Sequence, residues 1–123
     1  MSFLWVALGG ALGAMGRYAI SLIPIRSAFP VLTLITNLIG AVAIGFIAGI
    51  VSAKENVSPN LILFMKTGVC GGFTTFSTFS LEAYELFNEQ QYLFGSIYVC
   101  LSVVFCMIGI WFGKKISMAF IIY

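Results

Sequence analysis

The sequence predicts an all-α membrane protein with four transmembrane helices, the third of which is broken at its centre. The first observation behind this prediction is composition: the chain is 61% hydrophobic and 8% charged, with a mean hydropathy of +1.10. Soluble domains carry about 25% charged residues, and a chain of 123 residues is too short to bury so much apolar surface in one core. The second observation is that four apolar segments are each long enough to cross a bilayer, which takes about 20 residues.

The first predicted helix covers Phe3–Ile23 and ends near Pro24. Gly9 and Gly13 are four residues apart, a spacing that lets helices approach closely in lipid. Arg17, near the end of this helix, can extend its charge to the membrane surface. At a pore mouth it would raise the local potential and attract anions.

The second predicted helix covers Val31–Ala53 and ends at the polar sequence Lys-Glu-Asn. Asn37 is a lone amide within this apolar run, and Thr33 lies one turn before it on the same face. Such an amide can simply form an interhelical hydrogen bond, worth roughly 0.6 kcal/mol on average in membranes. Alternatively, its NH2 group can serve as a donor to an anion.

The third predicted helix covers Asn60–Phe87, about 28 residues, and contains the sequence CGGFTTFSTFS at Cys70–Ser80. The adjacent Gly71 and Gly72 each weaken a helix by about 1 kcal/mol relative to alanine. Unwound backbone at membrane depth is tolerated only where protein or a water-filled cavity covers it, and its free dipoles can hold ions. The stretch therefore predicts either an ion site or a mere kink, in which the hydroxyl groups bond back to their own helix.

Two aromatic residues in this stretch favour the ion site. Phe76 and Phe79 are three residues apart, so their rings share a helix face. The positive edge of an aromatic ring can attract a small anion without the full charge that would trap it. Hydroxyl donors lie close by at Thr75, Ser77 and Thr78, and Glu82 follows just beyond them.

The fourth predicted helix covers Tyr92–Phe112 and ends at Lys114–Lys115. Tyr98, Ser102 and Cys106 recur every four residues and so form one stripe. Tyr98 could be only an interfacial anchor, and Ser102 could bond back to its own helix. Together with the second and third helices, however, the stripe gives donor-bearing faces on three helices, enough to line a narrow path.

Charge and residue types exclude several classes of protein. The net charge of +2 is too small and too scattered for a nucleic-acid surface. The chain has no histidine, no metal-ligand spacing among its three cysteines and no nucleophile–base pair, so we expect neither an enzyme nor a cysteine-based metal site. No cleavable signal peptide is expected.

The orientation of the chain in the membrane is only weakly specified. Helix count places four lysines on one side and two arginines on the other, a small bias. The bias could have no meaning, or the chain could insert both ways and form a dual-topology dimer. The residues concerned are Lys54, Lys66, Lys114 and Lys115 against Arg17 and Arg26.

Three motifs resemble the fluoride channel family known as Fluc or CrcB. They are GGALGAMGRY at Gly9–Tyr18, TLITNLIG at Thr33–Gly40 and GVCGGFTTFSTFSLE at Gly68–Glu82. The third motif is long and specific, and the resemblance extends over essentially the whole chain, residues 1–123, as a single four-helix domain. In the fourth helix only the Tyr–Ser stripe supports it, and Cys106 departs from the hydroxyl residue that often continues that stripe.

The resemblance implies an antiparallel, dual-topology homodimer with two pores in the cell inner (plasma) membrane, or a heterodimer with an oppositely oriented relative. Phe76 and Phe79 look like the rings that flank fluoride, and Asn37 looks like the amide that contacts it. Gly71 and Thr74 look like the residues whose backbone carbonyls hold a central structural Na+. The rest of the implied fluoride path consists of Thr33, Ser77, Thr78, Glu82, Tyr98 and Ser102, with Arg17 at its vestibule.

Passive transport follows from the absence of any energy-coupling motif. A hydrated anion would exchange water for the Asn37 amide, hydroxyl groups and ring edges at several shallow sites. The alternative is a small multidrug transporter, which is also short and dual-topology. Those transporters resemble this chain in size but carry a proton-coupling glutamate in the first helix, where this chain has Arg17 and no acid. A non-transporting membrane subunit would not need donors on three helices.

Overall fold

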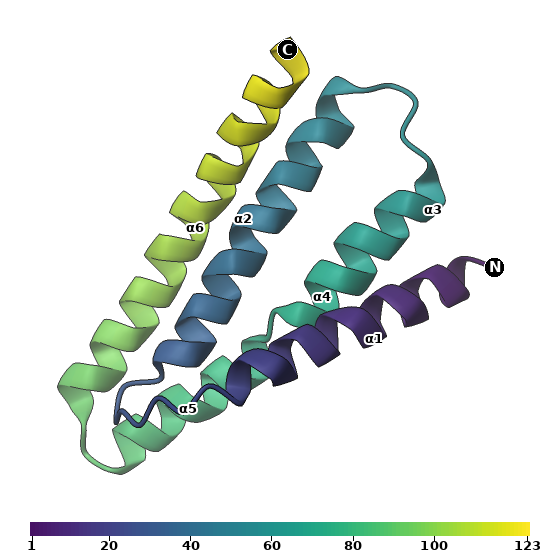
Figure 1. Cartoon of the computed structure of the whole chain (residues 1–123). Helices are drawn as coiled ribbons and strands as arrows, with labels where there is room; N and C mark the ends of the chain where they lie inside the picture. The colour runs from purple at the N-terminus through teal and green to yellow at the C-terminus, as the bar shows by residue number, and fades with distance from the viewer.

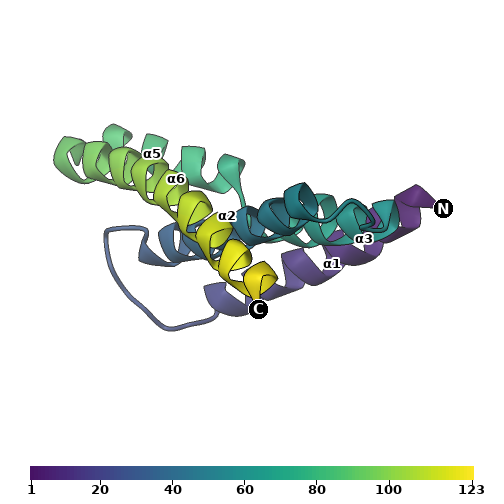
Figure 2. The ribbon, with the colours of Figure 1, turned by 90° about the horizontal axis from the view of Figure 1, so that it is seen from above.

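The computed structural model describes all 123 residues, and every regular element in it is helical. Helix α2 (Val31–Ala53) lies between α6 (Tyr92–Ile122) on one side and, on the other, α1 (Ser2–Ser21) together with the helical stretch Pro59–Phe73 (Figures 1 and 2). Helix α5 packs against α6 near the end where α6 begins (Figure 1). The elements in chain order are α1 (Ser2–Ser21), α2 (Val31–Ala53), α3 (Pro59–Ile62), the π-helix η1 (Leu63–Cys70), α4 (Gly71–Phe73), α5 (Phe76–Asn88) and α6 (Tyr92–Ile122).

Three helices are long and apolar enough to cross a membrane, namely α1, α2 and α6 with 20, 23 and 31 residues. Few residues are buried within the chain, 17 of 123, and most large apolar side chains are exposed. A surface this apolar must be covered by lipid or by another chain. The all-helical membrane class that the sequence predicts is therefore confirmed.

The third predicted span, Asn60–Phe87, is divided into two helical parts. Helical backbone runs from Pro59 to Phe73, is extended at Thr74 (φ −82°, ψ 157°) and Thr75 (φ −148°, ψ 120°), and resumes at Phe76. The expectation that the paired glycines open the helix is wrong, because Gly71 and Gly72 both remain helical. The extended residues are two threonines, whose β-branched side chains suit that conformation.

The glycines serve close packing instead. A Cβ atom on Gly68 would lie 2.8 Å from the Gly9 Cα, and one on Gly13 would lie 2.7 Å from the Phe73 backbone nitrogen. Helix α1 therefore contacts η1 and α4 backbone to backbone, as small residues allow in membranes. Gly45 and Gly113 have the same role between α2 and α6.

Helix α6 extends beyond the expected end at Phe112. It passes through Lys114 and Lys115 and ends at Ile122. Ser117, in this extension, is fully buried against Gly49, and its hydroxyl donates to the Lys114 carbonyl at 2.7 Å. The two lysines do not end the helix, because their long stems carry the charge away from the apolar surface.

Candidate functional site

Asn37 of α2 fixes the extended backbone between α4 and α5. Its Nδ2 donates to the Thr75 carbonyl at 3.0 Å, and its Oδ1 accepts from the Thr75 amide at 2.8 Å. The Asn37 amide thus replaces the backbone hydrogen-bond partners that a continuous helix would have supplied to Thr75. Unwound backbone in an apolar setting requires such partners. Nδ2 carries two hydrogens, so one remains available for another acceptor.

The same pair of hydrogen bonds releases a backbone carbonyl. In a continuous helix the Thr75 amide would donate to the carbonyl four residues earlier, that of Gly71. Here that amide donates to Asn37, so the Gly71 carbonyl loses its helical donor. Gly71 is exposed, and an added Cβ would meet no atom of the chain closer than the Lys66 carbonyl at 4.0 Å.

Thr75 also caps the helix that follows. Its Oγ1 accepts from the Thr78 amide at 3.2 Å, which satisfies one of the free donors in the first turn of α5. The Ser77 hydroxyl lies 3.5 Å from Thr75 Oγ1 and is exposed. The positive end of the α5 dipole therefore faces the interruption, together with two hydroxyl groups.

Three aromatic rings lie in a row from the surface to the core. The Phe76 and Phe79 centroids are 5.6 Å apart, and the Phe79 and Tyr98 centroids are 5.1 Å apart. Phe76 is 79% exposed, whereas Phe79 is 9% exposed and Tyr98 is fully buried. An exposed phenylalanine beside a buried one gives the chain a ring edge that only lipid, an ion path or a second chain could cover.

Glu82 binds two hydroxyl groups from different helices. Its Oε1 accepts from Thr33 of α2 at 2.7 Å, and its Oε2 accepts from Tyr98 of α6 at 2.8 Å. One carboxyl group thus accepts a hydrogen bond from each of two other helices. The resemblance assigns all three residues to the fluoride path, but the sequence did not predict these hydrogen bonds, which join α2, α5 and α6.

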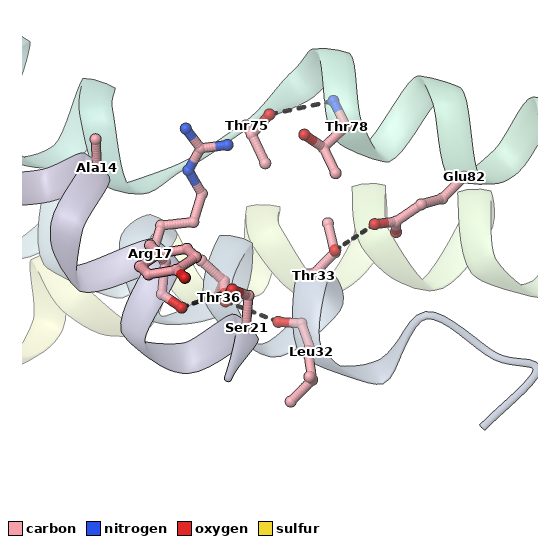
Figure 3. Close-up of a pocket in the computed structure, with 10 residues that line it drawn as sticks. Ala14, Arg17, Ser21, Leu32, Thr33, Thr36, Thr75, Thr78 and Glu82 are labelled. Atoms are coloured by element: carbon pink, nitrogen blue, oxygen red, sulfur yellow. Dashed lines mark hydrogen bonds between the residues drawn. The ribbon is translucent and has the colours of Figure 1, made fainter. Parts of the chain in front are cut away.

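One cavity lies on the Arg17 side of the interruption. This polar cavity has a volume of about 330 Å³ and is open on one side. Arg17 and Glu82 lie on opposite sides of it, with the Arg17 guanidinium directed toward Thr75 (Figure 3). The Nε atom of Arg17 is buried and has no hydrogen-bond partner. The lining residues are Ala14, Arg17, Tyr18, Ser21, Leu32, Thr33, Thr36, Thr75, Thr78 and Glu82.

A second cavity, the ring cavity, has a volume of about 340 Å³ and opens on the outer surface of the chain. Thr75 lines both cavities, so the fixed threonine separates them. Ser102 lines the ring cavity, and its Oγ atom is buried without a hydrogen-bond partner. The lining residues are Asn37, Gly40, Ala41, Ile44, Cys70, Thr74, Thr75, Phe76, Phe79, Ser102, Val103, Cys106 and Ile110.

The structure gathers most of the predicted site residues at these two cavities, but not all. Arg17, Thr33, Thr78 and Glu82 line the polar cavity, and Asn37, Thr74, Phe76, Phe79 and Ser102 line the ring cavity. Gly71, Ser77 and Tyr98 line neither.

Thr36 lines the polar cavity and was not predicted from the sequence. Its hydroxyl donates to the Leu32 carbonyl of its own helix at 2.7 Å. The signal was present, since Thr36 follows Thr33 by three residues and so shares its face.

Comparison with known proteins supports one family over nearly the whole chain. The family model described as "CrcB-like protein, Camphor Resistance (CrcB)" matches residues 4–114. A protein of Ruminiclostridium cellulolyticum named fluoride-specific ion channel FluC is 41% identical over 115 residues, covering 91% of this chain and 88% of the relative. A protein of the same name from Rhodospirillum rubrum is 43% identical over 118 residues and covers 92% of each chain. The Staphylococcus aureus (strain NCTC 8325) protein named fluoride-specific ion channel FluC 1 is 39% identical over 121 residues, covering 95% of this chain and all of the relative.

Proposed function

The chain belongs to the CrcB family, and we propose that it is a channel through which fluoride leaves the cell passively. The observation that carries this proposal is the name shared by the relatives, fluoride-specific ion channel, at about 40% identity over nearly full length. It is a membrane channel and not an enzyme. The small multidrug transporter is disfavoured, because α1 carries Arg17 and no acidic residue that could couple transport to protons.

Fluoride would enter through the polar cavity. Arg17 raises the potential there, and its unpartnered Nε is a donor that an anion could accept. Thr75 and Thr78 line the same cavity close to the α5 N-terminus, whose dipole favours negative charge. Each is a shallow site, as conduction requires, because an ion held too tightly would not leave.

Fluoride would then pass Thr75 and reach the ring cavity. The second Nδ2 hydrogen of Asn37, the Ser102 hydroxyl and the edges of Phe76 and Phe79 would replace its water. These donors carry no full charge, so a small anion gains enough to enter and not enough to stay. Larger halides would be disfavoured by size, and cations by the shortage of free acceptors.

Glu82 would hold the hydroxyl donors of Thr33 and Tyr98 in place and would not bind the fluoride ion by itself. Its two oxygens each accept one hydroxyl hydrogen, from Thr33 and Tyr98, which spreads the negative charge over the group. Ser77 would contribute its exposed hydroxyl at the entrance to α5.

An antiparallel dual-topology dimer with two pores would complete the path. The exposed Phe76 and the open ring cavity are the features that a second chain could cover. The weak Lys/Arg bias is compatible with insertion in both orientations. The partner would be an identical chain, or an oppositely oriented relative.

A structural Na+ would lie where the two chains meet, held by backbone carbonyls of Gly71 and Thr74. The donor set fits a hard cation, which prefers oxygen ligands, and the Gly71 carbonyl has no helical donor and lies on an exposed surface. One chain offers only this pair, so the site would need the carbonyls of both. Sodium would supply cohesion at the interface and would take no part in fluoride movement.

The membrane would be the cell inner (plasma) membrane, where an inside-negative potential favours anion exit by about 2.3 kcal/mol per 100 mV. Fluoride that enters as the neutral acid would ionise inside and leave through the channel.

The ring edges can be tested with Phe76→Ile. Because Phe76 is 79% exposed, the substitution removes an aromatic edge and little packing. We expect fluoride efflux from proteoliposomes to fall by at least about tenfold, because one of the few donors along the path is lost. The matched control is Phe105→Ile, which changes an exposed ring on α6 that lines neither cavity. Equal efflux from the two variants would remove the ring edges from the proposed path.

A further inference from the structure

One face of α6 is exposed and apolar except for a single lysine. Helix α6 packs on α2 through Gly109 and Gly113, whose added Cβ atoms would meet atoms of α2. The residues of α6 that line the ring cavity lie on this side of the helix as well. The opposite face is therefore free of both α2 and the proposed fluoride path. It carries six exposed residues, Val104, Met107, Ile108, Trp111, Lys115 and Met118.

The lysine on this face lies against a tryptophan. The Lys115 Nζ is 5.9 Å from the centroid of the Trp111 ring, within the range of a cation–π contact. Trp111 is 59% exposed, and tryptophan is enriched at the level of lipid headgroups, where its ring meets lipid and its N–H meets polar groups. Lys114 is the next residue and is exposed too. Two ammonium groups and an indole N–H therefore gather here, and all three are donors that cannot accept.

The packing of α6 on α2 gives the depth of the lysine pair in the membrane. The two helices run side by side in the same direction (Figure 1), and a Cβ atom on Gly49 would lie 3.4 Å from the Lys114 Cα. From Val31, where α2 begins, to Gly49 the helix rises by about 27 Å. The hydrocarbon core is about 30 Å thick. Lys114 and Lys115 therefore lie at its boundary, where the lipid phosphates begin.

The chain supplies no counter-charge to the lysine pair at this level. It has four acidic residues, and three of them belong to α5 or its C-cap, at the end of the molecule where α6 begins (Figure 1). The fourth, Glu55, follows Lys54 in the loop after α2. Charges at the membrane boundary are normally paired or directed to a polar group. The anionic partner of Lys114 and Lys115 must therefore come from outside the chain.

We propose that Trp111, Lys114 and Lys115 bind the headgroup of one anionic phospholipid, such as phosphatidylglycerol. The phosphodiester oxygens accept from the two ammonium groups and from the indole N–H, and hydrogen bonds between ions of opposite charge are the stronger class. The acyl chains lie on the apolar part of the same face, along Met107 and Val104. The three headgroup ligands line neither cavity, so this site goes beyond the proposed fluoride path and does not depend on it.

Trp111 itself can report the binding. The chain has two tryptophans, so Trp5→Phe leaves Trp111 as the only one and keeps an aromatic ring against Phe64. The full-length variant is placed in phosphatidylcholine vesicles that contain small fractions of brominated phosphatidylglycerol or brominated phosphatidylcholine. Bromine in the acyl chains quenches tryptophan fluorescence on contact, so the two quenching curves give the relative affinity of the two lipids for the surroundings of Trp111.

We expect phosphatidylglycerol to be preferred at Trp111 by at least about fivefold, the effect of one lysine near an anionic lipid surface. The preference should disappear when Lys114→Gln and Lys115→Gln are added together, and persist when both become arginine, which keeps the charges. Arg26→Gln is the matched control, because it removes a cation from the loop between α1 and α2, at the other end of the molecule, and is expected to leave the preference unchanged.

A second reporter separates a local site from general attraction of anionic lipid. Trp111→Phe leaves Trp5 of α1 as the only tryptophan, and we expect a weaker preference there. The same preference at both tryptophans, equal quenching of Trp111 by the two lipids, or a preference that survives the two glutamine substitutions would overturn the site. So would a Trp111 that neither lipid quenches, because another protein chain would then cover this face. A protein that passes no fluoride but keeps the preference would contradict only the proposed function.

Discussion

At the scale of single residues, Asn37 shows how one side chain can replace the hydrogen-bond partners that a helix backbone supplies. Its amide has the donor and acceptor of a peptide group and bonds to both polar groups of Thr75. From the sequence the amide could be recognised as unusual within an apolar run, and an interhelical hydrogen bond was one of the two alternatives. The partner could not be predicted, because it is a main-chain group whose position depends on where the helix stops.

We expect Asn37→Ala to destabilise the fold. The substitution leaves the Thr75 amide and carbonyl unpaired, and each buried unsatisfied group costs about 1–3 kcal/mol. Thermal unfolding in detergent would measure the loss. Thr36→Val is the matched control, because the Thr36 hydroxyl bonds only to its own helix and its removal is expected to cost little. Equal unfolding temperatures for the two variants would mean that Asn37 does not fix the interruption.

At the scale of elements, the glycines explain both what the sequence predicted and what it missed. Small residues at four-residue spacing correctly predicted close helix packing. A different rule, that glycine weakens a helix, misplaced the interruption at Gly71 and Gly72. Glycine also permits close helix contact, and that contact can stabilise the helix. The extended residues are Thr74 and Thr75, and what decides between these effects is the neighbouring helix, which the local sequence does not describe.

The packing account predicts opposite outcomes for adjacent glycines of α1. In Gly9→Ala the new Cβ would lie 2.9 Å from the Gly68 Cα and 3.0 Å from the Val69 nitrogen, backbone atoms that cannot rotate away. We expect a loss of about 1–3 kcal/mol of stability from this overpacking. In Gly10→Ala the Cβ meets nothing within 4 Å, and alanine improves helix propensity by up to about 1 kcal/mol.

Unfolding of the two variants by denaturant in mixed micelles would compare them directly. A Gly10→Ala protein less stable than Gly9→Ala would contradict the arrangement of α1 against η1.

The end of α6 illustrates a different limit of sequence analysis. Lys114 and Lys115 predicted a stop, yet the helix continues to Ile122. A charged pair marks a membrane surface more reliably than a helix end, because the lysine side chain can extend to water while the backbone remains helical. Ser117 lies in the unpredicted part of α6. Its burial against Gly49 depends on how α2 and α6 pack, which the local sequence does not show.

At the scale of the whole molecule, the chain by itself leaves most of its large apolar side chains and one wall of the ring cavity exposed. Lipid can cover the exposed apolar side chains. It cannot form one wall of an ion path, because the ion would then have no hydrogen-bond donors on that side. Composition predicted the membrane class from the sequence. The cavities could not be predicted, because they depend on residues from five separate elements, α1, α2, η1, α5 and α6.

Gly71 tests the proposed dimer. Within one chain the site of an added Cβ at Gly71 is open. Gly71→Val is therefore expected to change the free energy of unfolding of the single chain only through helix propensity, by less than about 0.7 kcal/mol. We expect the dimer to weaken, because the bulk would separate the carbonyls proposed to hold Na+. Size-exclusion chromatography with light scattering would report the assembly, and circular dichroism would verify the helices. A dimer that remains intact, with unaltered dependence on Na+, would contradict the proposed sodium site.

The most direct test of the whole account is ion efflux from liposomes that contain the purified protein, followed with a fluoride electrode and, in parallel vesicles, with a chloride electrode. The account predicts rapid release of fluoride once a permeant counter-ion is provided, while chloride stays inside. Vesicles that retain fluoride as well as protein-free vesicles do, or that release both halides at the same rate, would contradict it.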